Sequence, residues 1–267
     1  MICLGKKNVL GILVDATDYE AVVERTVQAA RQRQPFAVSA TAVHSVMKGV
    51  LSETHKYRLN HFDFVLPDGQ PVRWALNLLH DAGLAERVYG PQVTQLLLER
   101  AEKENLGVYF YGSSAEILTA LRHNLEERFP RLRISGVEPS RFRKLCCQER
   151  DGVVERIRRS GASLTFVGLG CPRQDVWVFE YRERLSMPVV AVGGAFGVLA
   201  GTVSQAPGWM QDRGLEWVFR LASEPRRLWR RYLLLNPAYA ALIILQAVGL
   251  LTFPTHGLEP PEELLYG

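Results

Sequence analysis

The chain has 267 residues, 47% of them apolar, which is enough for one large α/β domain with an appendage or for two small domains. Its formal net charge of +4 is modest, so we expect no nucleic-acid partner. The four cysteines lack metal or redox spacing, which indicates a reduced, cytoplasmic protein, and we expect neither a metal nor a cofactor. Lys6, Lys7 and Asn8 interrupt the N-terminal segment, which therefore lacks a signal-peptide core.

Apolar runs alternate with amphipathic segments through most of the chain. We predict strands at residues 8–14, 36–40, 63–66, 108–111, 132–137, 164–167 and 188–192. Helices are predicted at residues 18–33, 72–79, 90–98, 113–129 and 152–159, and others begin near residues 43 and 172. Strands that alternate with helices in this way predict an α/β fold: a Rossmann-like, mostly parallel sheet with helices on both faces.

The most informative stretch is the sixth predicted strand, which feeds a helix. Gly168 and Gly170 follow its apolar run, and Pro172 suits the first helical position. The free N–H groups of a helix N-terminus favour phosphate, although a Gly-Leu-Gly turn also occurs where a strand end simply packs. Gly193 and Gly194 end the next strand. Because parallel strands end at one edge of the sheet, the two glycine loops together favour a pyrophosphate site.

The turn Pro67-Asp68-Gly69 ends another predicted strand. This sequence is common in turns, so Asp68 can be a turn former and nothing more. Its place at the carboxyl end of a parallel strand favours a function, because open α/β sheets bind ligands there. A carboxylate at that edge could act as a general base, and Asp68 is therefore the candidate catalytic residue.

The sequence lacks an Asp-x-Asp pair, the usual holder of a divalent ion on a nucleotide-sugar diphosphate, and it has neither a Walker A nor a G-x-G-x-x-G motif. A departing diphosphate would then need arginines and helix N-termini, at roughly 1.5–3 kcal/mol per charge-assisted hydrogen bond. Arginines crowd one C-terminal stretch: Arg220, Arg226, Arg227, Arg230 and Arg231. They could bind phosphate, or they could form a solvated or membrane-facing side of a helix.

From Gly201 the predicted strands stop and the pattern becomes helical. A helix from Pro225 would place four arginines on one face and apolar side chains on the other, and Asn236-Pro237 would end it. The apolar stretch 238–253 is shorter than the ~20 residues that span a bilayer, so we expect it to lie in the membrane interface, with a short transmembrane passage as the alternative. The chain thus divides into a catalytic domain (1–202), an Arg-rich membrane-associating appendage (203–254) and a flexible tail (255–267).

Several segments, in the same order, resemble the WecG/TagA/CpsF glycosyltransferases of bacterial envelope polysaccharide synthesis, over roughly residues 9–232. The similar segments are residues 63–71, 166–175, 192–196, 199–202, 206–211, 214–217 and 224–231. The resemblance implies a metal-independent, inverting transfer of an N-acetylmannosamine-type sugar from a UDP-sugar donor to a polyprenyl-diphosphate-linked acceptor. It implies a peripheral enzyme on the cytoplasmic face of the cell membrane, and it leaves a homo-oligomer open.

The resemblance also implies roles for single residues. The carboxylate of the family's P-D-G segment, the proposed base, corresponds to Asp68. The P-K/R-Q-E segment near the nucleotide corresponds to residues 172–175, and the C-terminal arginines that meet the diphosphate and the membrane correspond to the cluster from Arg220. The candidate substrate-binding residues are Thr41, Gly168, Gly170, Pro172, Arg173, Gln174, Gly193, Gly194, Phe196, Arg220, Arg226, Arg227 and Arg230.

The chain departs from the family pattern in its polar positions. Ala40-Thr41-Ala42 replaces the usual Thr-x-Asn after the second strand, and Gly197 ends a segment that usually reads G-G-A-F-D. The usual acid after the Gly90 turn is Gln92, and Asp175 replaces a Glu. These changes affect the identities of the donor and the acceptor more than the type of reaction.

Two other functions compete with a glycosyltransferase. A membrane-tethered sugar-nucleotide-binding protein without transferase activity would keep the glycine loops and would not need Asp68. A Rossmann oxidoreductase is disfavoured, because residues 13–16, at the first strand and turn, lack the glycine fingerprint of a dinucleotide site.

Overall fold

The computed structural model describes residues 1–257 and 259–267. Its centre is a six-stranded sheet in the order β4-β3-β8-β7-β5-β6, in which all neighbouring strands are parallel. The strands are β3 (Phe36–Thr41), β4 (Phe64–Pro67), β5 (Val108–Tyr111), β6 (Ile134–Glu138), β7 (Leu164–Val167) and β8 (Pro188–Ala191). The predicted α/β fold is confirmed, and the carboxyl ends of these strands share one edge.

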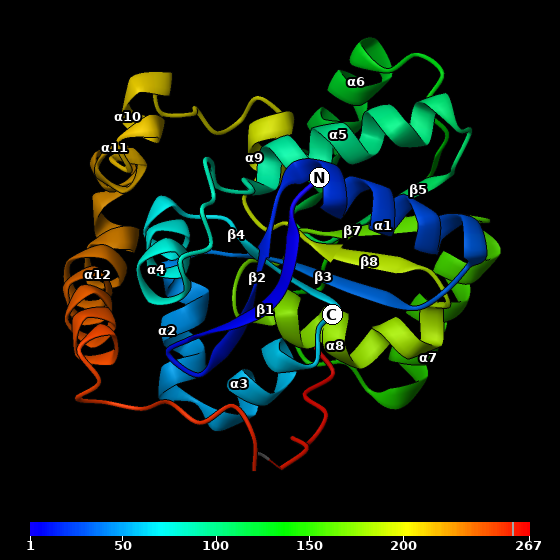
Figure 1. Ribbon diagram of the computed structural model, residues 1–267. Coiled ribbons are helices and arrows are strands. Elements are labelled where there is room, and N and C mark those ends of the chain that lie inside the picture. The colour runs from blue at the N-terminus through cyan, green and yellow to red at the C-terminus, as the bar shows by residue number, and fades with distance from the viewer. Residues whose placement is uncertain (258) are drawn as a thin grey trace.

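Helices cover both faces of the sheet (Figure 1). They are α1 (Tyr19–Gln32), α2 (Val43–Leu51), α3 (Glu53–Asn60), α4 (Gln70–His80), α5 (Gly90–Lys103), α6 (Ala115–Arg128), α7 (Cys147–Arg159), α8 (Arg173–Leu185) and α9 (Ala195–Leu199). Phe110 of β5 lies in one core with α1, α5 and α6, whereas Tyr109 and Tyr111 lie in the other with α2, α7 and α8. Because alternate side chains of a strand point to opposite faces, two apolar layers form.

The prediction of a first strand at residues 8–14 is wrong. The chain instead forms an antiparallel hairpin outside the main sheet, with β1 (Cys3–Val9) and β2 (Ile12–Thr17). Leu10 and Gly11 connect the two strands, both with positive φ (53° and 84°). Turns of this kind match the right-handed twist of hairpin strands. The sequence conceals the turn because Leu10 is apolar and continues the run on either side.

The C-terminal part is helical, as predicted, with α10 (Gly208–Asp212), α11 (Glu216–Ser223) and α12 (Pro225–Ala247). The predicted end at Asn236-Pro237 is wrong, because α12 continues through Pro237. An internal proline costs a helix about 3 kcal/mol, but Tyr239 and Ile243 beyond it are buried, and the Tyr239 hydroxyl donates to the Pro71 carbonyl (3.2 Å). Tertiary packing thus outweighs the local signal. Among the described residues, no helix has the length and apolar character needed to cross a membrane.

We predicted a flexible tail at residues 255–267, of which residue 258 lies outside the described residues. The structure corrects this prediction at Leu264 and Leu265, whose backbone is bound to the domain. The N–H groups of Leu264 and Leu265 donate to the buried carboxylate of Glu180 in α8 (2.7 and 2.9 Å). The acidic composition of the tail favoured a solvated segment, but its backbone finds partners on the domain.

Candidate active site

Asp68 directly follows β4, at the carboxyl edge of the sheet. Its N–H donates to the carbonyl of Thr41 at the end of β3 (3.2 Å), and the N–H of Gly90 at the start of α5 donates to Asp68 Oδ1 (2.7 Å). Burial raises the pKa of Asp68, while Arg87 and the Gly90 N–H act in the opposite direction. Asp68 is therefore a fixed carboxylate with an elevated pKa, a combination found in general bases.

Helix α11 closes the site from the other side. Arg87 Nη1 pairs with Glu216 Oε2 (2.7 Å), and the Tyr89 hydroxyl donates to Glu216 Oε1 (3.3 Å). Arg220, one turn further along α11, approaches the loop after β8, where a Cβ on Gly194 would lie 3.1 Å from its Nη2. Glycine at this position leaves the room that the guanidinium needs. Burial lowers the pKa of Arg220, but nearby acidic groups outweigh that effect and the net shift is upward.

Two clefts meet at these side chains. The larger extends to α12, and the smaller extends to the loop after β8 and to residues 203–206. The residues that line both clefts are Asp68, Tyr89, Glu216 and Arg220. The candidate base thus lies where two substrates can approach from different sides.

The structure separates the predicted arginines. Arg220 lines both clefts, whereas Arg226, Arg227 and Arg230 are exposed on α12. Arg227 Nη2 pairs with Glu224 of the same helix turn (2.8 Å). These three arginines line neither cleft around Asp68.

Arg231 belongs to the predicted arginine cluster but not to the candidate substrate-binding residues, and it lines the larger cleft. Burial lowers its pKa, and its Nε is buried with no hydrogen-bond partner among the described residues. Helical spacing could have found it, because Leu228 and Tyr232 on the same face of α12 are buried. Trp217 and Tyr232, with ring centroids 6.1 Å apart, add an aromatic wall to this cleft. Arg87 and Tyr89 were also missed, and no local motif marks them.

The two glycine loops lie next to each other, at the ends of β7 and β8, as predicted. Gln174 lies between them: the Gly170 N–H donates to its Oε1 (3.1 Å), and a Cβ on Gly193 would lie 2.8 Å from that oxygen. The Phe196 ring packs on Gly168, where a Cβ would lie 2.5 Å from Cδ2. Close packing accounts for Gly168 and Gly193. The Gly170 N–H donates to Gln174 Oε1, and a phosphate oxygen could take the place of this acceptor.

The remaining predicted residues lie at the margins of the site. The Thr41 side chain is buried beneath the edge, with its Oγ1 3.1 Å from Ser39 Oγ, so its backbone carbonyl is the group that supports Asp68. Pro172 precedes α8 and Arg173 begins it. Arg173 is exposed, and its guanidinium lies 5.7 Å from the ring centroid of Tyr266.

The chain matches the model of the glycosyl transferase WecG/TagA/CpsF family over residues 7–252. It belongs to this family. It is 31% identical over 196 residues to the N-acetylglucosaminyldiphosphoundecaprenol N-acetyl-beta-D-mannosaminyltransferase of Bacillus subtilis (strain 168), and the match covers 73% of each chain. A protein of the same name from Bacillus spizizenii is 30% identical over 187 residues, 70% of each chain. The resemblance seen in the sequence is confirmed, and the chain is a glycosyltransferase of the WecG/TagA/CpsF family.

Two departures from the WecG/TagA/CpsF pattern lie in a cleft wall or directly behind one. Ala42 lines the larger one, at the position where the pattern has Asn. At Gly197, where the pattern has an acid, a Cβ would lie 2.7 Å from Cγ2 of Val203, a residue that lines the smaller cleft. The Val203 side chain therefore occupies the space that an aspartate side chain at position 197 would need. Both departures remove polar groups while Asp68 is retained.

Three side chains under the glycine loops each offer one ligand atom that a metal ion could use. These atoms of His55, Cys171 and Asp175 lie within 4.8 Å of one another. Ser39 Oγ and Ser45 Oγ already donate to the Asp175 carboxylate (2.7 and 3.3 Å). Burial and the neighbouring Asp175 carboxylate raise the pKa of Cys171, so it is a thiol when no metal is bound. The group is best described as a buried polar anchor that ties the start of α8 to β3 and α2.

Proposed function

We propose that this protein is a membrane-associated, inverting glycosyltransferase that moves an N-acetylmannosamine-type sugar from UDP to a polyprenyl-diphosphate-linked sugar. The observation that carries the proposal is the place of Asp68, which is fixed by the Gly90 N–H at the junction of two clefts. The names of the two Bacillus relatives support the sugar and the lipid-linked acceptor.

In the proposed reaction, Asp68 takes the proton of an acceptor hydroxyl as that oxygen attacks the anomeric carbon of the donor. The attack comes from the face opposite UDP, so the C1–O bond to UDP breaks and the anomeric configuration inverts. The raised pKa makes Asp68 a stronger base than an ordinary aspartate. The donor would lie at the junction of the two clefts, with its diphosphate beside the loop after β8 and facing α11 and α12, and the acceptor would reach Asp68 through the larger cleft.

Negative charge grows on UDP as it departs. We assign the stabilisation of this charge to Arg220 and Arg231. Both line the larger cleft, and Arg220 also reaches the loop after β8. A charge-assisted hydrogen bond from a guanidinium contributes about 1.5–3 kcal/mol. The Gly170 N–H would take a phosphate oxygen in place of Gln174. This arrangement needs no divalent metal.

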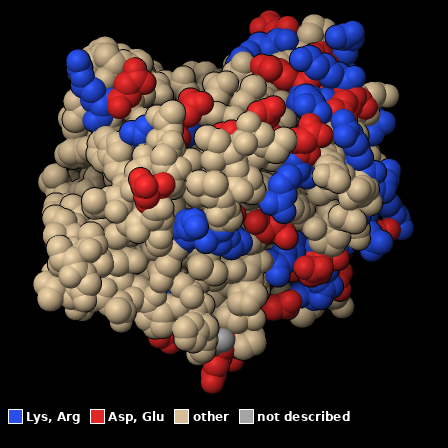
Figure 2. Space-filling view, viewed as in Figure 1, with Lys and Arg blue, Asp and Glu red and all other residues tan. Residues whose placement is uncertain are grey.

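Peripheral binding to the membrane is proposed for the outer side of α12 and the residues after it. Exposed apolar side chains there are Leu233, Leu234, Ile244, Val248, Leu250 and Leu251. In Figure 2, charged side chains are sparse on the side that carries α12 and gather on the opposite side. Arg226, Arg227 and Arg230 would meet anionic headgroups, at about 1 kcal/mol each. The lipid-linked acceptor would then enter the larger cleft, which α12 lines.

A second function, sugar-nucleotide binding without transfer, is favoured by one observation. Ala42 lines the larger cleft and Gly197 packs behind Val203 of the smaller one, so two family positions lack their usual polar groups. A protein that only binds a sugar nucleotide would retain the glycine loops and the arginines.

The test is incubation of the full chain with a panel of UDP-sugars and a short polyprenyl-diphosphate glycolipid, with and without EDTA, read by mass spectrometry. A glycolipid that gains one N-acetylhexosamine under both conditions supports the transferase. UDP binding with no product from any donor supports the binding protein. Activity that is lost in EDTA and restored by Mg²⁺ contradicts the assignment of the arginines to the leaving group.

A further inference from the structure

Residues 253–267, which we call the C-terminal strap, lie beyond the part of the chain that matches the family model. After α12 the chain turns back and crosses the catalytic domain, as the orange to red segment of Figure 1 shows. Arg58 Nη2 in α3 donates to the carbonyl of Glu262 (2.8 Å). The strap therefore runs from the end of α12 to α3 of the catalytic domain.

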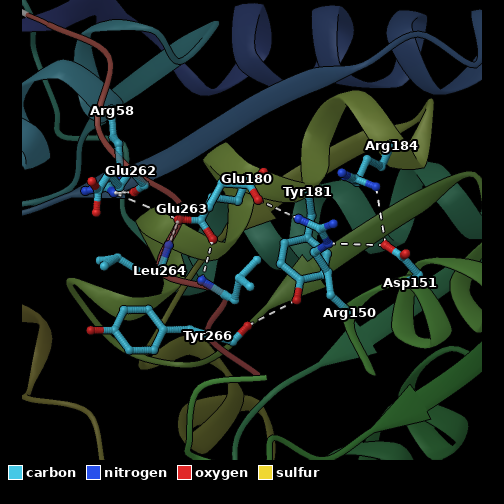
Figure 3. A network of polar contacts seen from close by, with 11 residues as sticks. Arg58, Arg150, Asp151, Glu180, Tyr181, Arg184, Glu262, Glu263, Leu264 and Tyr266 are labelled. Atoms are coloured by element: carbon cyan, nitrogen blue, oxygen red, sulfur yellow. Dashed lines mark hydrogen bonds and ion pairs between the residues drawn. The ribbon is translucent and has the colours of Figure 1, made fainter. Parts of the chain in front are cut away.

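A buried carboxylate holds the strap on the domain. Glu180 in α8 accepts the N–H groups of Leu264 and Leu265 (2.7 and 2.9 Å), and Arg150 Nη1 in α7 pairs with Glu263 (2.6 Å). Figure 3 shows these groups converging on the strap. The Glu180 side chain is only 2% exposed, so its charge depends on these donors. The docked strap is thus part of the folded domain.

The end of the strap lies at the carboxyl edge of the sheet. Leu145, in the loop after β6, donates its N–H to the Leu265 carbonyl (2.7 Å), and the Tyr181 hydroxyl donates to the Tyr266 carbonyl (3.3 Å). These two bonds fix the backbone immediately before and after the Tyr266 Cα. The Arg173 guanidinium lies against the Tyr266 ring. Arg173 is the first residue of α8, behind the loop that follows β7.

The position of this pair relative to Asp68 indicates what ligand it would meet. Asp68 follows β4 and Arg173 comes after β7, and the strand order between them is β4-β3-β8-β7. Three strand spacings of about 4.8 Å separate the two strand ends by about 14 Å. An extended UDP-sugar has a comparable length. With its anomeric carbon at Asp68 and its diphosphate along the loops after β8 and β7, where the Gly170 N–H would meet it, its nucleoside would reach the start of α8.

We propose that Tyr266 is a positioning residue that holds Arg173 at the nucleoside end of the donor site. This inference rests on the proposed function. A free arginine must give up side-chain freedom on binding, whereas one held against an aromatic ring has already given up part of it. Arg173 then presents its planar set of N–H donors to the oxygens of the nucleoside.

The test uses UDP and inorganic pyrophosphate as probes, with calorimetry on the full chain. Tyr266→Leu and Tyr266→Ala should weaken UDP binding about two- to fivefold, as expected for loss of an exposed cation–π contact, and leave pyrophosphate binding unchanged. Tyr266→Phe keeps the ring and should bind UDP like the wild type. Glu262→Gln is the matched control, because this residue contacts the domain through its backbone carbonyl. In an Arg173→Ala background, Tyr266→Leu should have no further effect.

Two results would overturn the positioning role and leave the proposed function intact: equal losses of UDP and pyrophosphate affinity, or no loss of either. A wild-type chain that does not bind UDP would overturn both proposals. Hydrogen exchange at the Leu264 and Leu265 amides shows whether the strap stays docked, and the comparison uses the Tyr266 substitution that keeps these amides protected.

Discussion

The two sides of the candidate site are held in different ways. On the sheet side, the Thr41 carbonyl and the Gly90 N–H fix Asp68 through backbone hydrogen bonds. On the appendage side, Glu216 depends on side-chain contacts such as its ion pair with Arg87, and α10 and α11 contain no buried residues. Elements with few buried side chains open at a lower free energy than a core does. We therefore expect the appendage to open more readily than the sheet edge that holds the Asp68 carboxylate.

Asp68→Asn removes the base and leaves the sheet side otherwise intact, since Asn Oδ1 can still accept the Gly90 N–H. We expect transfer to fall by about 10² to 10⁴, the usual contribution of general base catalysis, and UDP affinity to change little. Steady-state rates and calorimetry with UDP measure the two effects. Asp81→Asn, at an exposed position after α4, is the control. Near wild-type turnover in Asp68→Asn would leave Asp68 as a turn former.

Substitution of single arginines tests the appendage side. Arg220→Ala and Arg231→Ala should each lower transfer to a water-soluble acceptor about ten- to a hundredfold, because each removes a charge-assisted hydrogen bond to the leaving group. Arg226→Ala, on the exposed side of the same helix as Arg231, should change this rate less than twofold. Equal effects at the three positions would contradict the division between cleft-lining and exposed arginines.

The proposed membrane contact of α12 should be separable from catalysis. Leu234→Gln and Ile244→Gln alter side chains that are each 59% exposed, and each should weaken binding to anionic vesicles about three- to tenfold through lost apolar burial. The rate with a water-soluble acceptor should stay constant. Leu4→Gln, on the exposed side of β1, is the control in co-sedimentation. Unchanged vesicle binding in both α12 variants would place the membrane contact elsewhere.

The sheet side could be predicted from sequence because its signals are local. Gly170 lies in the loop that follows one apolar run and Asp68 directly follows another, and parallel strands bring such positions to one edge. The pairing of Arg87 with Glu216 could not be predicted, because it depends on how the appendage docks and neither residue lies in a motif. Pro237 shows the same limit, since long-range packing carries α12 through a residue that ends most helices. The catalytic and binding roles of these residues stay predictions.

The smallest expected effect is on the Tm, because the charged form of the buried Asp68 side chain destabilises the fold. Burial raises the pKa of Asp68 above its ordinary value of 3.8, and Arg87 and the Gly90 N–H offset this only in part. The folded protein therefore holds this proton more tightly than the unfolded chain, and the fold loses stability as the pH rises from 3.8 through the raised pKa. Asp68→Asn should then raise the Tm near neutral pH, and the gain should vanish below the ordinary pKa.

Glu149→Gln provides a control of opposite sign for this measurement. Hydrogen bonds from Arg143 and from the Cys146 N–H lower the pKa of Glu149 to about 2, so its charged form stabilises the fold at neutral pH. Its removal should lower the Tm there and have no effect at a pH below about 2. Calorimetric scans across this pH range compare the two variants. A lower Tm for Asp68→Asn at neutral pH would mean that the sheet edge stabilises the charged carboxylate, and Asp68 would then lack the raised basicity that its proposed role needs.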